Sequence, residues 1–346
     1  ELAMVDVTIY GAGVFGLSVA WACQCRGADV RVIDPNGIAA GASGGVVGAL
    51  APHVPENWND KKQFQFESLT MAEAFWAEVS DACGMDAGYG RLGRLQPILE
   101  EGQIALAKQR AETAKTFWQG QFHWRVIEAD TFANFAPSPS GYLIEDSLSA
   151  RIHPRRATHA LAQAIRANGG EISLEGKAEG AVVWATGVAG LEALSNQNGR
   201  PAGLGVKGQA ALLDFDGRGL PQLFADSLHI IPHADGTTAI GSTSERDYSD
   251  PSTTDEQIDA IIARARHLCP ALQSATVLEK WAGLRPRARS RAPMIGRHPT
   301  QANAFIANGG FKIGFGMAPK IGAVMADLIL DGHDSIPESF KPEASL

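Results

Sequence analysis

The spacing of apolar residues changes twice within the first thirty-four positions of the chain. Apolar and polar residues alternate over residues 5–9, which is the period of a half-buried strand. After a glycine-containing segment at 11–16, apolar residues recur at near-helical spacing through 17–23, and a short apolar run then ends at Asp34. The pattern predicts a strand, a tight turn, a helix and a second strand.

The predicted turn carries the spacing GxGxxG at Gly11, Gly13 and Gly16. The first glycine permits the turn, the second lets the backbone approach a pyrophosphate, and the third lets helix and strand pack closely. Asp34 lies roughly 20 residues downstream, where a carboxylate accepts hydrogen bonds from an adenosine ribose and disfavours a 2′-phosphate. The unit predicts dinucleotide binding and disfavours NADP, but it does not separate FAD from NAD. A glycine turn without a ligand is the alternative.

A second stretch of small residues spans 36–54 and is too apolar for a solvated linker. Small side chains let the backbone come close to a large flat ligand, and Ser43 offers a hydroxyl for a phosphate or a ring edge. The alternative is a flexible loop.

The remaining chain alternates helical and strand-like patterns. A short buried strand at 182–184 returns the chain to the dinucleotide sheet, and short alternating strands over 207–243 predict an antiparallel sheet that forms the floor or lid of a substrate pocket. A second glycine-rich turn, 309–319, implies that both ends of the chain converge on one cofactor. Helices are predicted at about 60–83, 101–117, 154–168, 254–267 and 320–330.

Charge and cysteine usage narrow the class of protein. The 346 residues include 38 acidic and 30 basic side chains, for a net charge of −8 with no basic block, so neither nucleic acid nor an anionic membrane is an expected partner. The four cysteines have no metal-ligand spacing, and no metal is expected. Without a signal peptide before the first strand or an apolar run of membrane-spanning length, a cytoplasmic protein is expected. A homo-oligomer is compatible with the sequence, which does not fix the oligomeric state.

Seven motifs stand in order along the chain: GAGVFG with Asp34, ASGGVVGALAPH, VVWATG, VKGQ, WAGLRP, PMIGRHP and GGFKIGFGMAP. Taken in this order, the motifs resemble the D-amino-acid oxidase superfamily of FAD-dependent amine oxidoreductases, within it the glycine oxidase and sarcosine oxidase branch. The resemblance spans nearly the whole chain and implies an α/β fold (α+β overall), with a Rossmann-like FAD-binding domain and a substrate domain built on an antiparallel sheet. The implied FAD-binding domain comprises 1–55, 140–205 and 280–346, and the substrate-binding domain comprises 56–139 and 206–279.

The resemblance also implies noncovalent FAD, because nothing resembles the cysteine-linked flavin site of the superfamily. The small β-meander that carries adenine contacts in the family is nearly absent between 171 and 182, so weaker FAD affinity is expected. The cofactor-binding residues implied by motif position are Gly11, Gly13, Val14, Phe15, Gly16, Asp34, Pro35, Ala42, Ser43, Val47, Gly48, Ala49, Gly187, Gly310, Phe311, Lys312, Ile313, Gly314, Phe315 and Gly316.

Three side chains are implied at the substrate. Arg285, in the LRP motif, corresponds to the arginine that holds the substrate carboxylate, with a structural salt bridge as the alternative. Lys312 stands where glycine oxidases have a second carboxylate-binding arginine, and a lysine there could instead assist the reaction with oxygen. His229 stands where the branch usually has a tyrosine facing the substrate, and an ordinary polar role is its alternative.

The implied activity is oxidation of a small amino acid or secondary amine, of the glycine, sarcosine or D-amino-acid type. Hydride transfer to the flavin gives an imine that water converts to a keto acid and an amine, with hydrogen peroxide if oxygen is the acceptor. Two alternatives stay open. One is a flavin enzyme acting on a carboxymethylamino group of a larger substrate such as modified tRNA, and the other is a noncatalytic FAD-binding subunit of a dehydrogenase complex.

Overall fold

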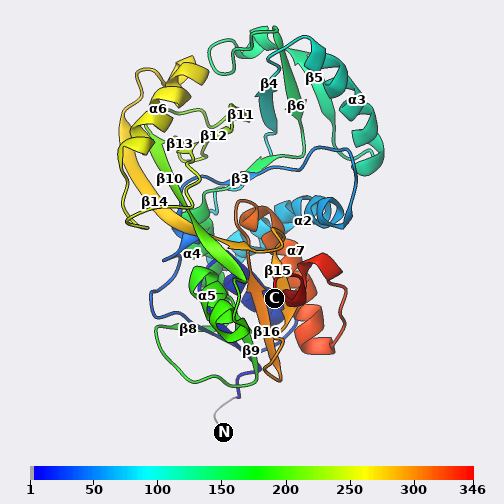
Figure 1. Cartoon of the computed structure of the whole chain (residues 1–346), viewed down its shortest axis with the longest axis vertical. Coiled ribbons are helices and arrows are strands. Elements are labelled where there is room, and N and C mark those ends of the chain that lie inside the picture. Colours follow the sequence, from blue (N-terminus) through cyan, green and yellow to red (C-terminus); the bar gives the residue numbers. More distant parts are fainter. Residues whose placement is uncertain (1–3) are drawn as a thin grey trace.

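The computed structural model describes residues 4–346 and contains two large sheets, one in each half of the molecule in Figure 1. A six-stranded sheet in the lower half has the order β15-β16-β9-β1-β2-β8, and an eight-stranded sheet in the upper half has the order β14-β10-β13-β12-β11-β4-β6-β5. These sheets confirm the predicted α/β class.

The six-stranded sheet is parallel except for one edge strand. β1 lies between β2 and β9, and β15 pairs antiparallel with β16. The central strands are fully buried at apolar positions such as Val7, Ile9 and Val183, as expected when helices cover both faces. The strands are β1 (Val7–Tyr10), β2 (Val30–Ile33), β8 (Glu171–Ser173), β9 (Ala181–Trp184), β15 (Met294–Arg297) and β16 (Ala304–Asn308).

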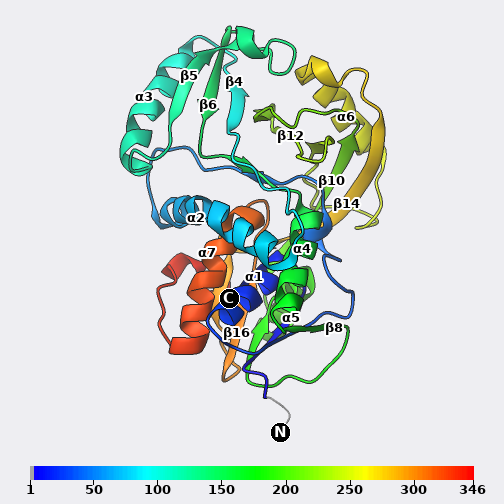
Figure 2. The ribbon, with the colours of Figure 1, turned by 180° about the vertical axis from the view of Figure 1, so that it is seen from behind.

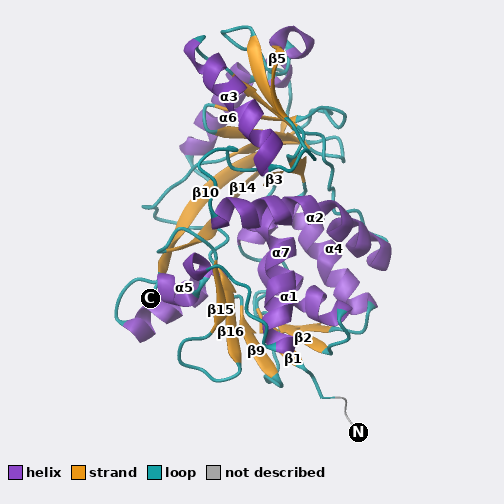
Figure 3. Ribbon diagram, turned by 90° about the vertical axis from the view of Figure 1, so that its right-hand side faces the viewer, coloured by secondary structure: helices purple, strands orange, loops and turns teal. Residues whose placement is uncertain are grey.

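Helices α1, α4 and α7 lie on one side of this sheet, and α5 lies on the other (Figure 3). Helix α2 crosses between the two halves and packs on α7 and α4 (Figures 2 and 3). The bounds are α1 (Val14–Cys25), α2 (Asp60–Cys83), α4 (Pro154–Ala167), α5 (Gly187–Asn198) and α7 (Gly314–Ala326), the last followed by a π-helical turn, η4 (Asp327–Asp331).

The prediction that the last helix begins near residue 320 is wrong, because α7 begins at Gly314 and contains Pro319. Glycine and proline disfavour a helix, but α7 is buried against α1 and α2, and this packing outweighs local propensity. At Gly322 an added Cβ would lie 2.6 Å from the carbonyl oxygen of Ser18 in α1, so the glycine permits the close helix contact.

The eight-stranded sheet is antiparallel except for the parallel pair β11 and β4. Helix α6 packs on β10 and β13, and α3 packs on β5. The elements are β4 (Arg94–Pro97), α3 (Gly102–Phe117), β5 (Trp124–Glu128), β6 (Tyr142–Asp146), β10 (Gly203–Leu213), β11 (Gln222–Ala225), β12 (Leu228–Pro232), β13 (Thr238–Gly241), α6 (Glu256–Leu268) and β14 (Val277–Ala288). A two-stranded sheet, β3 (Ala49–Leu50) with β7 (Ala150–Arg151), lies between the halves.

The domain division stays a prediction, but the elements can be placed against it. β6 and β14 are strands of the eight-stranded sheet, whereas the expected boundaries at 140 and 280 put most of both in the FAD-binding domain. Helix α2, expected in the substrate domain, contributes its buried residues to the same core as α1 and α7.

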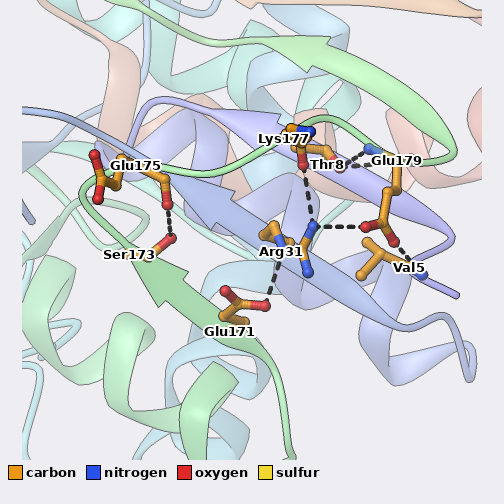
Figure 4. A network of polar contacts seen from close by, with 8 residues as sticks. All are labelled: Val5, Thr8, Arg31, Glu171, Ser173, Glu175, Lys177 and Glu179. Carbon is orange, nitrogen blue, oxygen red and sulfur yellow. Dashed lines mark hydrogen bonds and ion pairs between the residues drawn. The ribbon is translucent and has the colours of Figure 1, made fainter. Parts of the chain in front are cut away.

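The segment after β8 is a short loop (Figure 4). β8 pairs with β2 over three residues, and the chain reaches β9 through residues 174–180 without further strands. Arg31 of β2 donates to Glu171 Oε2 at 2.8 Å, to the Lys177 carbonyl at 3.0 Å and to Glu179 Oε1 at 3.2 Å. Glu179 also exchanges two hydrogen bonds with the Thr8 hydroxyl. The second half of the loop is therefore held against β1 and β2.

Candidate active site

A cavity of about 940 Å³ lies where both glycine-rich turns meet the eight-stranded sheet. Arg285, His229 and Lys312 line it together with all but three of the predicted cofactor-binding residues. The exceptions are Gly16, Ile313 and Gly316. Gly16 packs on the backbone of Gly11, and the other two lie at the start of α7. The structure thus brings residues from both ends of the chain and from its middle into one cavity.

The first turn has the backbone geometry that the GxGxxG spacing requires. Gly11 has φ +111°, and an added Cβ would lie 2.6 Å from the carbonyl carbon of Ala185, the residue that follows the neighbouring strand β9. Gly13 is the N-cap of α1 and makes no side-chain hydrogen bond to the helix amides, and Gly13, Val14 and Phe15 line the cavity. The arrangement fits a pyrophosphate at the helix N-terminus.

Two polar side chains complete this end of the cavity. The Ser43 hydroxyl accepts a hydrogen bond from Val14 N at 2.9 Å, which leaves its own proton for an acceptor in the cavity. The Asp34 carboxylate accepts from Ala12 N at 2.9 Å and from Asn36 N at 3.0 Å. A carboxylate has further lone pairs, so it can still accept from a ribose hydroxyl.

The segment 43–49 is not a flexible loop. His233 Nε2 donates to the Val46 carbonyl at 2.7 Å, and Arg155 Nε donates to the Gly44 carbonyl at 3.0 Å. Ile152 N donates to the Gly48 carbonyl at 3.0 Å. His233 and Arg155 were not found from the sequence, because both lie more than 100 residues from the segment they hold and belong to no motif in it.

The second turn is joined to the first by packing and to β14 by a hydrogen bond. An added Cβ at Gly310 would lie 2.9 Å from the Phe15 ring, so the two turns are in contact. Phe311 N donates to the Pro286 carbonyl at 3.0 Å. The position of this turn is therefore fixed by the strand that also carries Arg285.

Arg285 projects from β14 into the cavity, and its guanidinium lies over Gly208 of β10. Nη1 donates to the Thr243 carbonyl at 3.2 Å, and Nη2 donates to the Ser242 hydroxyl. Within residues 4–346 no carboxylate lies within salt-bridge distance of it, so the structural salt bridge considered as an alternative is absent there. Burial lowers the pKa of Arg285 to about 10, and the nearby Glu245 carboxylate opposes this change. The guanidinium stays charged at neutral pH.

His229 of β12 stands at the same end of the cavity. Its ring lies 4.7 Å from the Phe224 ring, and its Nδ1 has no hydrogen-bond partner among the described residues. Burial lowers its pKa to about 3, with further contributions from Arg94, Arg285 and Lys312. The imidazole is therefore neutral near pH 7.

Lys312 lines the cavity from the second turn, with Nζ 5.3 Å from the centre of the Phe311 ring. Burial lowers its pKa, and repulsion from Arg285 and Arg287 adds to the effect. Among residues 4–346, no group lies close enough to the Lys312 ammonium to form a hydrogen bond or an ion pair with it. Two cations without acidic partners thus share this end of the cavity.

Trp281 is a cavity residue that the sequence did not single out. Its ring lies 3.3 Å from the position of an added Cβ at Gly45 and would clash with one at Gly283. Gly283 stands only two positions after Trp281 and Gly45 lies far upstream, and the missing side chain of each leaves room for the indole.

The comparisons with known proteins agree with this geometry. Residues 6–328 match the family model described as FAD dependent oxidoreductase. The chain belongs to this family. FAD is therefore its cofactor, and the resemblance carried by the ordered motifs is confirmed.

A glycine oxidase from Bacillus licheniformis is 26% identical over 373 aligned positions, which cover 98% of this chain and 97% of that protein. The crystal structure of glycine oxidase from Bacillus cereus matches with a TM-score of 0.82 at 24% identity, covering 95% of this chain and 96% of the other. That of iminodiacetate oxidase from Chelativorans sp. BNC1 matches with a TM-score of 0.84 at 20% identity, covering 97% and 99%. The two structures show that the fold is shared.

The site of this oxidoreductase fits FAD. The unsubstituted backbone at Gly11 and Gly13, the Ser43 hydroxyl and the Asp34 carboxylate suit the pyrophosphate and ribose, and the long cavity leaves room for a flat ring near Val47. Among residues 4–346 no three His, Cys, Asp or Glu side chains are grouped to hold a metal ion. In the same part of the chain, no helix is long and apolar enough to cross a membrane.

Proposed function

We propose that this FAD-dependent oxidoreductase oxidises a small amino acid or secondary amine whose carboxylate is bound by Arg285. The observation that carries the proposal is a buried guanidinium without a carboxylate partner at the end of the FAD cavity. A guanidinium presents two parallel N–H donors, which can bind both oxygens of a carboxylate at once. The names of the relatives, glycine oxidase and iminodiacetate oxidase, support a substrate with an amine next to a carboxylate.

The chain's own residues orient the substrate and set its protonation state. Arg285 fixes the carboxylate, so the α-carbon is held at one distance from the cofactor. Arg285 and Lys312 together disfavour an ammonium ion in the cavity, which lowers the pKa of the bound amine and favours the free base. His229 is neutral, so it adds no third positive charge beside those of Arg285 and Lys312, and it provides a polar side chain in the cavity lining. No protein nucleophile is required.

FAD, when bound, would supply the two-electron acceptor for the hydride of the substrate α C–H. With the carboxylate held by Arg285, the amine nitrogen would lose a proton and the substrate would become an imine. Water would then hydrolyse the imine to the keto acid or aldehyde acid and ammonia or an amine, with oxygen (giving hydrogen peroxide) or another compound as the final electron acceptor.

We propose that FAD is held noncovalently by the predicted residues that line the cavity. The four cysteines are free, and none of them lines the cavity. The short loop at residues 174–180 provides no β-meander at the adenosine end, which supports weaker FAD affinity than in relatives with a longer segment. A measured dissociation constant as tight as theirs would contradict this expectation.

Lys312 has two candidate roles that one variant separates. If it binds a substrate carboxylate, Lys312→Met raises KM for the amino acid. If it assists the reaction with oxygen, the same variant leaves KM unchanged and slows reoxidation of the reduced enzyme. Both quantities are measured on one preparation by anaerobic reduction followed by mixing with air-saturated buffer.

The first experiment is an anaerobic spectral titration of the purified protein with glycine, sarcosine, D-alanine, D-proline and L-proline. Loss of the oxidised flavin band near roughly 450 nm supports the proposal. Rapid return of the band in air identifies an oxidase, and its persistent loss identifies a dehydrogenase. A yellow protein that no amine bleaches would contradict the proposal and support a noncatalytic subunit.

Arg285→Ala tests the carboxylate assignment directly. We expect a large increase in KM for the amino acid while the flavin spectrum stays intact. An unchanged KM would remove Arg285 from this role.

A further inference from the structure

A buried polar network adjoins Arg285 at the strand end that follows β13. Arg285 reaches the strand end that follows β13, where it donates to the Ser242 hydroxyl and the Thr243 carbonyl. The Thr243 hydroxyl donates to Glu245 Oε2 at 2.5 Å and accepts from Gln209 N at 2.8 Å. Thr243, whose carbonyl accepts from Arg285, is thus itself held by two hydrogen bonds of its hydroxyl, one to Glu245 and one from Gln209.

The centre of this network is the Glu245 carboxylate, which belongs to a residue only 9% exposed. Its Oε2 accepts from Gln209 Nε2 at 3.0 Å as well as from Thr243, and its Oε1 accepts from Gln257 Nε2 at 2.8 Å. Its backbone exchanges two hydrogen bonds with Lys207, each of 2.8 Å. A buried carboxylate is costly unless its lone pairs are satisfied, and here three donors satisfy them.

Helix α6 anchors the network from outside. Gln209 Nε2 donates to Asp255 Oδ1 at 2.9 Å, and Asp255 N donates back to Gln209 Oε1 at 3.0 Å. Asp255 is the N-cap of α6, so the network ends on a rigid element. The network joins β10, the neighbour of β14, to the next strand of the sheet, because Gln209 lies on β10 and Thr243 follows β13.

We propose that Thr243 and Glu245 are positioning residues, which hold the backbone and hydroxyl acceptors of Arg285 so that its guanidinium faces the substrate carboxylate. This inference rests on the proposed carboxylate role of Arg285. Neither residue lines the cavity, so both act through Arg285.

The proposal is tested with two pairs of variants in the FAD-bound enzyme. Thr243→Val removes the hydroxyl, whereas Thr243→Ser keeps it. Glu245→Ala removes the acceptor, whereas Glu245→Gln can keep the bonds from Thr243 and Gln209 on its amide oxygen if the Gln257 amide turns over. We expect Thr243→Val and Glu245→Ala to raise KM for the amino acid by about tenfold or more, and their conservative partners to change it less than about threefold.

Binding of acetate, followed by the shift of the flavin band, gives a readout that requires no turnover. We expect the dissociation constant of acetate to follow the same order as KM. Asp259→Asn is the matched control, because Asp259 lies on α6 outside the network and pairs with Lys280 at the surface. It should leave both constants unchanged.

Two results would overturn the proposal. Equal defects in Glu245→Gln and Glu245→Ala would mean that the charge of Glu245 matters and its hydrogen bonds do not. Wild-type affinity for acetate in both Thr243→Val and Glu245→Ala would mean that Arg285 needs no support. If no amino acid reduces the wild-type flavin, the proposed function fails, while the acetate series still decides the positioning role.

Discussion

Gly208→Ala changes no residue of the cavity lining, yet it should displace Arg285, the side chain proposed to bind the substrate carboxylate. Gly208 on β10 lies beside Arg285 of β14, and an added Cβ would lie 2.5 Å from Arg285 Nη1. Nonbonded carbon and nitrogen atoms need about 3.5 Å, so the guanidinium must move by roughly 1 Å. The displaced group is the far end of a flexible side chain, so it can move without disturbing the sheet.

A displacement of about 1 Å can cost about 100-fold in rate when orientation is required for the reaction. For Gly208→Ala this predicts a fall in kcat/KM of about 100-fold, equivalent to about 2.7 kcal/mol of transition-state stabilisation. The stability of the fold should change little. Replacing glycine by alanine at an extended position lowers the entropy of the unfolded chain, which favours the folded state by about 0.4–1 kcal/mol.

The assay combines the rate of anaerobic flavin reduction by the preferred amino acid with thermal unfolding of the same preparation. Gly102→Ala is the matched control, because an added Cβ there meets no atom within 4 Å. A Gly208→Ala enzyme with wild-type kcat/KM would refute the reasoning, since it would mean that the location of the guanidinium does not limit the reaction. Loss of folding would refute the claim that only the side chain moves.

Three further predictions concern the cofactor and the pH range. Gly16→Ala places a Cβ against the backbone of the first turn, so the protein should purify without the flavin absorbance that the wild type retains. Arg155→Met removes the hydrogen bond to the Gly44 carbonyl and should raise the FAD dissociation constant about tenfold, measured by quenching of FAD fluorescence. Burial lowers the pKa of His229 from 6.5 to about 3 and that of His153 from 6.5 to about 4. The unfolded chain therefore binds more protons below pH 6.5, and Tm should fall steadily as the pH is lowered from about 6.5 towards 4.

The elements that the sequence predicted well are those with a local signal. The helix at Asp60–Cys83 begins at the N-cap Asn59 and ends at Gly84 in the left-handed conformation, and both signals stand in the sequence. The first strand, turn and helix follow equally from the glycine spacing. By contrast, the start of α7 depends on burial of its Gly-rich first turns against α1 and α2, which no local pattern reports.

The same distinction holds in the site. Arg285 was predicted as a site residue because it stands in a motif, but no local pattern indicates which residues surround it. Glu245 and Trp281 each depend on a contact with a residue far away in the sequence. Gln209 and Glu245 are 36 positions apart, and the Val46 carbonyl that His233 binds is 187 positions from it. Gly45 and Trp281 are likewise far apart. Such pairs have no period and no spacing, so only the folded chain shows them.

Strand β14 connects Arg285, the proposed substrate-binding residue, to the second glycine-rich turn of the FAD cavity. It carries Trp281 and Arg285 on one continuous run, paired with β10 from Gly203 to Leu213. At its end, the Pro286 carbonyl accepts from Phe311 N, which fixes the second glycine-rich turn to the same strand. Helix α5 packs on both β10 and β14 and also on β16 of the six-stranded sheet. Relative motion of the two sheets would therefore have to disturb the packing of α5 between them and the hydrogen bond from Phe311 to β14.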